Sequence, residues 1–444
     1  MADKSINLMD FHKIGKKGEP YEIIDNKIAD YIIENENIIV IAGIPYIYKG
    51  GVYKSDKEGK IIRYLIKSMI IEDLINISRI NRVYQLIIVN TKLEVQIETV
   101  NQYPDSWINF KNGMLDAKTG ELHEHSPKYY SVNQIPHNYI PDQNIEETTF
   151  FQFLQSRIPN KDNQRMLFEF MGYAMTKGII FQKFMILHGL GESGKSTIIN
   201  FLSAMVGEEN ISSVPLQKLN ERFTTASLLL KTLNTCGDMP ASALTDTSVI
   251  KQLTGEDNIK GEYKGKDVFF FRNKAKMIFS CNELPRVLDE KSNGFYRRLL
   301  LIGFSESGEY IPDLKRKLAD ESEMEKVISG VVFYFKKSLI SGVLFESSEN
   351  SEAIQRMKIE SDSVEAFLTD MTEESPNHFI KKADVYSYYE QYCKEETRQP
   401  QGKQAFYKSM GIKGYATKMS NGYEGYRGLD IKLKPSGRTV FDNQ

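Results

Sequence analysis

The chain has 444 residues, of which 41% are hydrophobic and 26% are charged, so it is long enough for two to four domains and is not disordered as a whole. Its net charge of −2 argues against a protein that coats nucleic acid through bulk positive charge. No apolar stretch approaches the ~18 residues of a membrane span, and the N-terminus has no apolar signal-peptide core. Three widely separated cysteines (Cys236, Cys281, Cys393) suggest a reducing compartment, because they form neither a metal-binding spacing nor a disulfide framework. We therefore expect a soluble intracellular protein.

The first region, residues 1 to about 140, is predicted to be a mixed, strand-leaning α+β domain. Gly50-Gly51 separates two short apolar runs and predicts a β-hairpin, because the glycine pair supplies the positive φ of a tight turn. Asn112-Gly113 predicts a second turn. Helical periodicity follows at residues 150–158 and 166–175. We find no catalytic pattern in the first region.

Residues 180–310 alternate between short apolar runs and helical segments, which predicts a parallel α/β unit. The runs that we expect to be strands are 184–187, 231–236, 276–281 and 299–302. Residues 313–344 then follow a helical pattern. The polar, Ser-rich segment 346–352 is predicted to start a linker. The expected domains are therefore 1–140, 141–345 and 346–444.

The last ~80 residues are predicted to form a separate unit. Val385, Tyr388, Tyr389, Tyr392 and Cys393 share one helical face, a second helix is expected at 403–410, and Asn421-Gly422 predicts a hairpin. From residue 378 to residue 444, twelve Lys or Arg residues stand against seven Asp or Glu residues, a net charge of +5. Two helices and a hairpin at a basic end give the outline of a winged helix-turn-helix, a DNA-binding fold.

The segment from Gly189 to Thr197 matches the phosphate-binding pattern G-x-x-x-x-G-K-[ST] between a predicted strand and a predicted helix. Glycines allow backbone N–H groups to surround an anion, and the helix N-terminus adds its dipole. Lys195 is expected to reach the β- and γ-phosphates of a nucleoside triphosphate, and the Ser196 hydroxyl is expected to bind Mg²⁺. The predicted nucleotide-binding residues are Gly189, Gly191, Glu192, Ser193, Gly194, Lys195, Ser196 and Thr197.

Three later features complete the candidate site. Asp238 ends a predicted strand, where an acid can hold the Mg²⁺ shell, and Asn282 ends another, where an amide can position the attacking water. Arg297 and Arg298 precede the strand at 299–302; read alone, they would form an edge salt bridge. Between the acid and the amide, residues 253–271 predict two strand-like arms around a Lys-Gly-Lys tip.

This ordered set of segments resembles the superfamily 3 helicases, and within them the helicase portion of phage and plasmid primase–helicases, which are related to the poxvirus primase–helicase. The resemblance rests on Gly189–Thr197, Gly237-Asp238, residues 253–271, Ser280-Cys-Asn282 and residues 295–304. It extends to a pre-helicase region containing residues 107–116 and 125–141 and to a winged-helix tail at residues 367–431. It covers about residues 40–435.

The resemblance implies an AAA+-like P-loop core, with a parallel sheet flanked by helices, that assembles into a hexameric ring and couples ATP hydrolysis to movement on DNA. It implies that Asp238 is the Walker B acid and a Mg²⁺ ligand, and that Asn282 is the sensor amide. Arg298 best fits the arginine finger that acts on a neighbouring subunit, with Arg297 as the adjacent candidate. The implied DNA-binding lysines are Lys260, Lys264 and Lys266.

Two departures from the family pattern limit these expectations. Gly237 stands where many members carry a second acid, so the general base stays open. The region before the helicase portion is short and carries no paired metal-binding carboxylates, so we expect no primase activity. We expect a replicative helicase of a phage, plasmid or other mobile element, acting in bacterial cytoplasm on single-stranded and forked DNA, with host or phage replication proteins as candidate partners. The alternative is a DNA-binding replication initiator whose ATPase switches assembly; a packaging ATPase or a small-molecule kinase explains fewer of the motifs.

Overall fold

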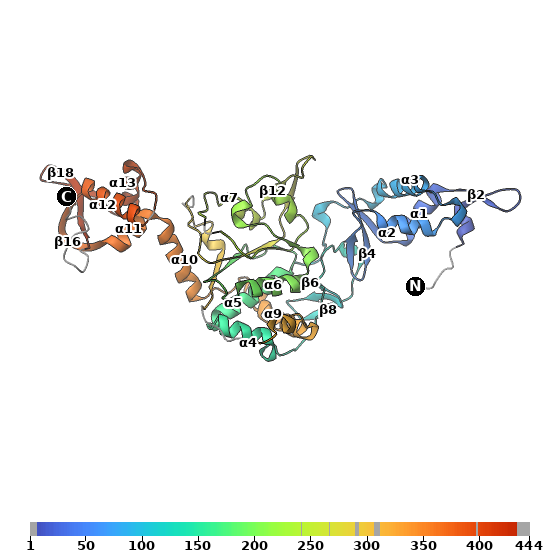
Figure 1. Cartoon of the computed structure of the whole chain (residues 1–444), viewed down its shortest axis with the longest axis horizontal. Helices are drawn as coiled ribbons and strands as arrows, with labels where there is room; N and C mark the ends of the chain where they lie inside the picture. Colours follow the sequence, from blue (N-terminus) through green and yellow to red (C-terminus); the bar gives the residue numbers. More distant parts are fainter. Residues whose placement is uncertain are drawn as a thin grey trace. The chain divides into compact units, whose positions relative to one another are not determined.

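A five-stranded parallel sheet lies at the centre of the larger of two units in the computed structural model (Figure 1). The structure describes residues 7–240, 242–265, 267–288, 293–305, 311–396 and 398–432. Contacts between Cα atoms group residues 1–239, 248–282 and 297–347 into the first unit, and residues 240–247, 283–296 and 348–444 into the second. The predicted domain boundaries near residues 140 and 345 stay predictions.

The strands of the central sheet are ordered β10-β11-β14-β9-β15, and every neighbouring pair is parallel. Their bounds are β9 Phe184–His188, β10 Ile211–Ser212, β11 Leu233–Cys236, β14 Lys276–Cys281 and β15 Leu299–Gly303. Almost every residue of the four longer strands is buried, as expected for a parallel sheet covered on both faces. The predicted α/β unit and its four strands are confirmed.

Helices that are distant in sequence pack together beside this sheet. The helix α9 contacts both α4 and α5 (Figure 1). The approach is close at Gly172 of α5, where an added Cβ atom would lie 2.3 Å from Cβ of Phe335 in α9. The bounds are α4 Thr149–Arg157, α5 Lys161–Met175, α6 Lys195–Val206, α7 Ser248–Leu253, α8 Leu314–Leu318 and α9 Glu321–Ser341. The predicted helices at 150–158, 166–175 and 313–344 are therefore confirmed.

The N-terminal part of the first unit is more helical than the sequence suggested. It contains α1 Asp25–Asn35, α2 Lys60–Ser68 and α3 Ile77–Ile88. Their isoleucine-rich faces share one buried cluster with β3, so tertiary burial outweighs the β propensity of isoleucine. The strands are β1 His12–Ile14, β2 Pro20–Ile23, β3 Ile38–Ile41, β4 Ile44–Lys49, β5 Val52–Ser55, β6 Trp107–Phe110, β7 Gly113–Asp116 and β8 Glu121–His123. The expectation of a mixed region is confirmed: among the described residues up to residue 140, three α-helices accompany eight strands.

Both predicted N-terminal turns are present. Gly50 and Gly51 have φ values of 60° and 89° and join β4 to β5. Residues 111 and 112 join β6 to β7, with Gly113 as the first residue of the second strand. The loop signals in this region therefore predicted the hairpins, although they did not predict the helices between them.

The second unit has its own buried cluster, drawn from helices and an antiparallel sheet of order β16-β18-β17. The elements are α10 Ser348–Ser361, α11 Ser363–Met371, β16 Thr372–Lys381, α12 Lys382–Glu395, α13 Lys403–Ile412, β17 Thr417–Ser420 and β18 Tyr423–Ile431. The two predicted helices and the Asn421-Gly422 hairpin are confirmed. The predicted linker at 346–352 is wrong in part, because α10 begins at Ser348. Serine and glutamate favour the first turn of a helix as well as loops.

Among the described residues, none of the helices combines the length and apolar character that crossing a membrane requires.

Candidate functional site

The loop between β9 and α6 carries the glycine-rich motif, and two of its glycines are required by the backbone and by neighbouring atoms. Gly194 has a φ of 98°, and an added Cβ would lie 2.6 Å from Cζ of Phe153. Gly189 has a φ of 151°, and an added Cβ would lie 3.0 Å from the carbonyl oxygen of Phe304. A side chain at either position would be strained in its own backbone and would meet a neighbour. The strand–loop–helix arrangement expected around the motif is therefore present.

Lys195, the first residue of α6, turns its ammonium group back into the loop. Its Nζ donates hydrogen bonds to the carbonyl oxygens of Gly189 at 2.6 Å and Leu190 at 2.8 Å, and to Oγ of Ser193 at 3.1 Å. It also donates to Oδ1 of Asn282 at 3.2 Å. The side chain is only 7% exposed, so the structure holds this positive charge inside the loop. Lys195 and Asn282, 87 positions apart, are thus brought together as the sequence predicted.

Asp238 and Asn282 follow neighbouring strands, β11 and β14, at the same edge of the sheet. Two hydrogen bonds join these strand ends: the Met239 N–H donates to the carbonyl oxygen of Ser280 at 2.8 Å, and Oγ of Ser280 donates to the carbonyl oxygen of Gly237 at 2.6 Å. Asp238 is exposed. This edge is where the carboxyl ends of parallel strands meet, the usual place for ligands in open α/β sheets.

Three side chains at this edge, Lys195, Cys281 and Asp238, affect one another electrostatically. Burial lowers the pKa of Lys195, while the nearby Cys281 and Asp238 oppose that shift. Burial raises the pKa of the Cys281 thiol to about 12, with Lys195 lowering it and Asp238 raising it. Cys281 therefore stays a neutral thiol near pH 7, and Asp238 is close enough to act electrostatically on Lys195.

The remaining motif residues face outward. Gly191, Glu192 and Ser196 are exposed, and Thr197 is half-buried. Ser196 lies in the first turn of α6, so its hydroxyl and the Asp238 carboxylate are the candidate ligands for Mg²⁺. Within the described ranges, no group of three or more His, Cys, Asp or Glu side chains could hold a metal. One carboxylate and one hydroxyl fit Mg²⁺, which takes most of its oxygens from water and from substrate phosphates.

The two candidate finger arginines lie at the other end of the sheet. Arg298 directly precedes β15, which is parallel to β9 and pairs Leu299 with Phe184. The Arg297 carbonyl oxygen accepts a hydrogen bond from Nζ of Lys183, just before β9. The glycine-rich loop instead follows the far end of β9. The structure therefore does not bring Arg297 or Arg298 to the loop of their own chain.

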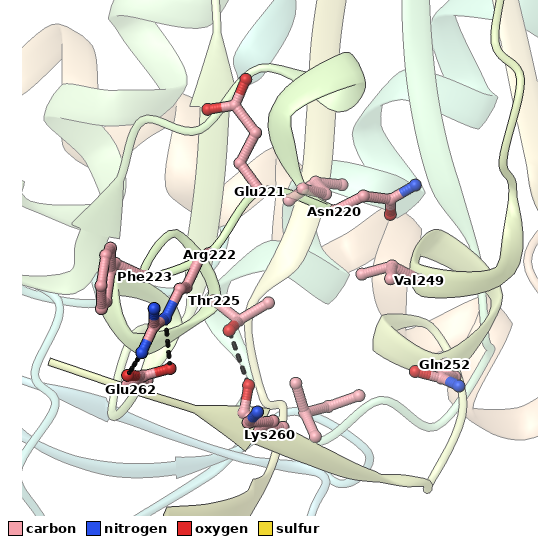
Figure 2. Close-up of a pocket in the computed structure, with 11 residues that line it drawn as sticks. Asn220, Glu221, Arg222, Phe223, Thr225, Val249, Gln252, Lys260 and Glu262 are labelled. Atoms are coloured by element: carbon pink, nitrogen blue, oxygen red, sulfur yellow. Dashed lines mark hydrogen bonds and ion pairs between the residues drawn. The ribbon is translucent and has the colours of Figure 1, made fainter. Parts of the chain in front are cut away.

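The predicted lysine hairpin consists of β12 Asn258–Gly261 and β13 Phe269–Arg272, which are antiparallel. Lys260 lies on β12 and Lys264 lies in the connection, both exposed, while Lys266 lies outside the described residues. Figure 2 shows how the connection of the hairpin is held where it leaves β12: Arg222 makes two hydrogen bonds to the carboxylate of Glu262, one of 2.9 Å. Oγ1 of Thr225 also donates to the Lys260 carbonyl oxygen at 2.7 Å (Figure 2).

The structure adds neighbours of the loop that the motif did not reveal. Phe153 and Arg157, both on α4, lie against Gly194, with Cγ of Arg157 3.5 Å from an added Cβ. The Arg157 carbonyl oxygen accepts a hydrogen bond from the N–H of Ser305, and the Phe304 N–H donates to the carbonyl oxygen of His188. No sequence signal pointed to these residues, because their proximity depends on how α4 packs beside β15.

Comparison with known proteins matches two family models to separate parts of the chain. Residues 26–158 match the family described as D5 N terminal like, and residues 187–298 match a family of unknown function, DUF5906. The protein "Putative helicase L207/L206" of Acanthamoeba polyphaga mimivirus is 26% identical over 207 residues. These likenesses support the resemblance to phage-type primase–helicases.

The extent of each likeness differs. The mimivirus alignment covers 44% of this chain, which spans about a fifth (21%) of that protein. The "Uncharacterized mitochondrial protein ymf21" of Marchantia polymorpha is 26% identical over 125 residues, which are 26% of this chain and 69% of that protein. Among solved structures, an apo form of the NrS-1 C-terminal region is 10% identical, with a TM-score of 0.49, over 90% of this chain and 97% of that one. The DUF5906 match includes the glycine-rich loop, Asp238, Asn282 and Arg298.

Proposed function

We propose that this primase–helicase relative is an ATP-dependent DNA helicase that acts in replication of a phage, plasmid or other mobile element. The observation that carries the proposal is the meeting of Lys195, Asn282 and Asp238 at one edge of a parallel sheet, beside a loop whose glycines adopt a backbone that would strain any other residue. A phosphate loop alone serves many enzymes. The relation to a helicase-named protein favours DNA unwinding among them.

The ATPase proposal assigns each residue a task. The N-terminus of α6 and the loop N–H groups would bind the phosphates, and Lys195 would exchange its contacts with the Gly189 and Leu190 carbonyl oxygens for phosphate oxygens. Ser196 and Asp238 would hold Mg²⁺, which when bound supplies charge neutralisation at the β- and γ-phosphates. Asn282 would orient the attacking water. The general base stays open, because Gly237 replaces a second acid.

The ring proposal rests on the position of Arg298. Since this arginine lies at the opposite end of β15 from the loop of its own chain, it can assist hydrolysis only from a neighbouring subunit. We therefore propose a homo-hexameric ring with active sites at the interfaces, as in AAA+-like proteins. Such head-to-tail contacts close into rings when the rotation between subunits permits.

DNA would be contacted at two places. Lys260, Lys264 and Lys266 would touch the phosphate backbone from the β12–β13 hairpin, whose connection is held at its start by the Arg222–Glu262 pair. The second unit would act as a winged helix, with α12, α13 and the β17–β18 hairpin as its DNA-binding parts. Its net charge of +5 from residue 378 onward favours attraction to a polyanion.

The proposal is tested by ATP-dependent strand displacement on forked duplexes that carry a single 3′ or 5′ tail. We expect wild-type protein to unwind one of these forks only with ATP and Mg²⁺. Lys195→Ala should be inactive while still folded. Fork binding and ATP hydrolysis without unwinding would reject the helicase and favour a replication initiator whose ATPase switches assembly.

A further inference from the structure

Two neighbouring cavities lie between the N-terminal part of the first unit and the β12–β13 hairpin of the same unit. The larger has a volume of about 890 Å³ and is bordered by β4, β5 and the segment 207–210. The smaller has a volume of about 540 Å³ and is bordered by residues 97–102 and by Asn258 and Arg272 on the hairpin. Both are lined by Asn133 and by residues 229–231, so they adjoin there; the pair of cavities is named the groove.

The smaller cavity is strongly basic. Lys177, Lys231, Arg272 and Lys274 line it, and Glu98 is the one acidic residue among its lining residues. Arg272 and Lys274 are exposed. Lys177 and Lys231 are held in place by hydrogen bonds. Nζ of Lys177 donates to the carbonyl oxygen of Asn101 at 2.8 Å, and Nζ of Lys231 donates to the carbonyl oxygen of Glu209 at 2.6 Å. These charges are therefore arranged around a space rather than dispersed over a surface.

The charges also oppose one another. Burial lowers the pKa of Lys177 and of Lys276, and the charge of Lys274 lowers both further. Asp105 compensates in part, with Oδ1 3.5 Å from Nζ of Lys177. Counting Glu98 on the lining and Asp105 beside Lys177, two carboxylates face the four basic side chains of the cavity, which leaves a surplus of positive charge there. An anion bound there would relieve this repulsion.

The junction of the two cavities is rigidly built. Nδ2 of Asn133, a buried residue, donates to the carbonyl oxygen of Leu230 and to Oδ1 of Asn210, both at 2.9 Å. Oδ1 of Asn133 accepts from Nδ2 of Asn101 at 2.9 Å. Leu230 itself has a φ of 59°, a conformation that costs a non-glycine residue free energy. Strain of this kind persists only where the surroundings enforce it, and it is concentrated at functional sites.

The shape of the groove favours a strand over a compact ligand. Beyond the junction, the larger cavity is lined by Lys54, Lys57 and Lys111, by three tyrosines, Tyr46, Tyr53 and Tyr263, and by two acidic residues, Glu208 and Glu209. Tyr263 is 44% exposed and directly precedes Lys264 of the hairpin connection. Basic side chains that follow a groove, with aromatic rings at intervals, are the recurring arrangement for single-stranded nucleic acid.

We propose that this groove, from Lys274 and Arg272 past Leu230 to Tyr263, binds a segment of single-stranded DNA that continues from the hairpin lysines of the same subunit. Phosphates occupy the basic cavity, and bases lie against Tyr46 and Tyr263. The inference rests on the proposed function, since it extends the path of the DNA beyond the hairpin tip.

The test compares the variant Arg272→Gln/Lys274→Gln with Lys16→Gln/Lys17→Gln, which removes the same charge from exposed lysines of the β1–β2 turn. Binding of a fluorescent oligothymidylate is measured over a range of salt concentrations, and thermal unfolding checks the fold. For single strands the slope of log K against log salt changes by about 0.7 per phosphate contact. We expect the groove variant to lose about 1.4 from the slope, and the control variant to match wild type.

A second measurement locates the strand directly. Photo-cross-linking with an oligonucleotide that contains 4-thiothymidine should label peptides with Tyr46 or Tyr263 in the wild-type protein, and labelling should fall in Arg272→Gln/Lys274→Gln. If wild type binds oligothymidylate but the groove variant has an unchanged slope and labelling, the inference is overturned while the helicase proposal stands. If inorganic phosphate protects the cavity and the variant loses only phosphate binding, the site takes a small anion instead. If wild-type protein binds no single-stranded DNA, the proposed function fails first.

Discussion

Arg298→Ala should leave ATP binding intact and slow hydrolysis by about 10³-fold, because an arginine finger stabilises charge on the transferring phosphoryl group. The structure determines where that arginine can act. Four strand steps separate Leu299 from Gly303, which pairs with His188 next to the glycine-rich loop. At ~3.3 Å per residue these steps span ~13 Å, well beyond the reach of an arginine side chain. If Arg298 assists hydrolysis, it therefore has to do so at the site of a neighbouring subunit.

Mixing Arg298→Ala with Lys195→Ala tests this geometry quantitatively, because the fraction of working interfaces in the mixture can be calculated. A working interface needs an intact Lys195 on one subunit and an intact Arg298 on the next. With equal amounts and random exchange, about a quarter of interfaces combine the two intact halves in a ring of head-to-tail contacts. ATP turnover of the mixture should therefore rise from near zero to about a quarter of the wild-type value, measured by phosphate release across mixing ratios.

The control is subunit exchange, shown by co-purification of differently tagged chains. With exchange shown, absence of recovery at every ratio would refute Arg298 as the finger acting between subunits. Arg297→Ala would then be mixed with Lys195→Ala in the same way, because Arg297 is the adjacent candidate. If activity recovers in the Arg297→Ala mixture but not in the Arg298→Ala mixture, Arg297 is the arginine finger and the proposed ring stands.

Further predictions concern the loop, the packing and the second unit. Lys195→Ala should abolish ATP hydrolysis with an unchanged circular dichroism spectrum, because the lost charge lies in a loop at the sheet edge; wild-type turnover would reject the phosphate-loop assignment. Gly172→Ala should lower the unfolding midpoint, because ~1–3 kcal/mol of overpacking against Phe335 exceeds the ~1 kcal/mol gain in helix propensity. Gly411→Ala, whose added Cβ meets nothing within 4 Å, is the matched control and should not lower it. Residues 362–444 should fold alone and bind duplex DNA weakly, as a melting curve and a gel-shift titration would show, since their buried cluster is self-contained; a segment without a cooperative transition would contradict this.

Local patterns were enough to predict much of the fold. The four apolar runs became β9, β11, β14 and β15, because a strand buried on both faces needs a nearly continuous apolar sequence. The glycine-rich loop could be placed because its spacing is dictated by backbone geometry that few sequences satisfy. The hairpins at Gly50-Gly51 and Asn421-Gly422 followed from the positive φ that their turns require.

Contacts between distant segments were decided only by the tertiary structure. The sequence could name Lys195 and Asn282, but their hydrogen bond exists because β14 lies beside β9 in the sheet. It could propose that Arg298 acts on a neighbour, but the parallel pairing of β15 with β9 is what separates that arginine from its own loop.

Helices and charges that depend on remote partners were the least predictable. The isoleucine-rich segments of α1 to α3 could have been strands, since their helical faces are buried against each other and against remote segments such as β3. Lys177, Arg272 and Lys274 carry no motif and lie almost a hundred positions apart at the extremes, yet they surround one cavity. A local sequence pattern specifies which backbone conformations are low in free energy, whereas the position of a charge in space depends on the path of the whole chain.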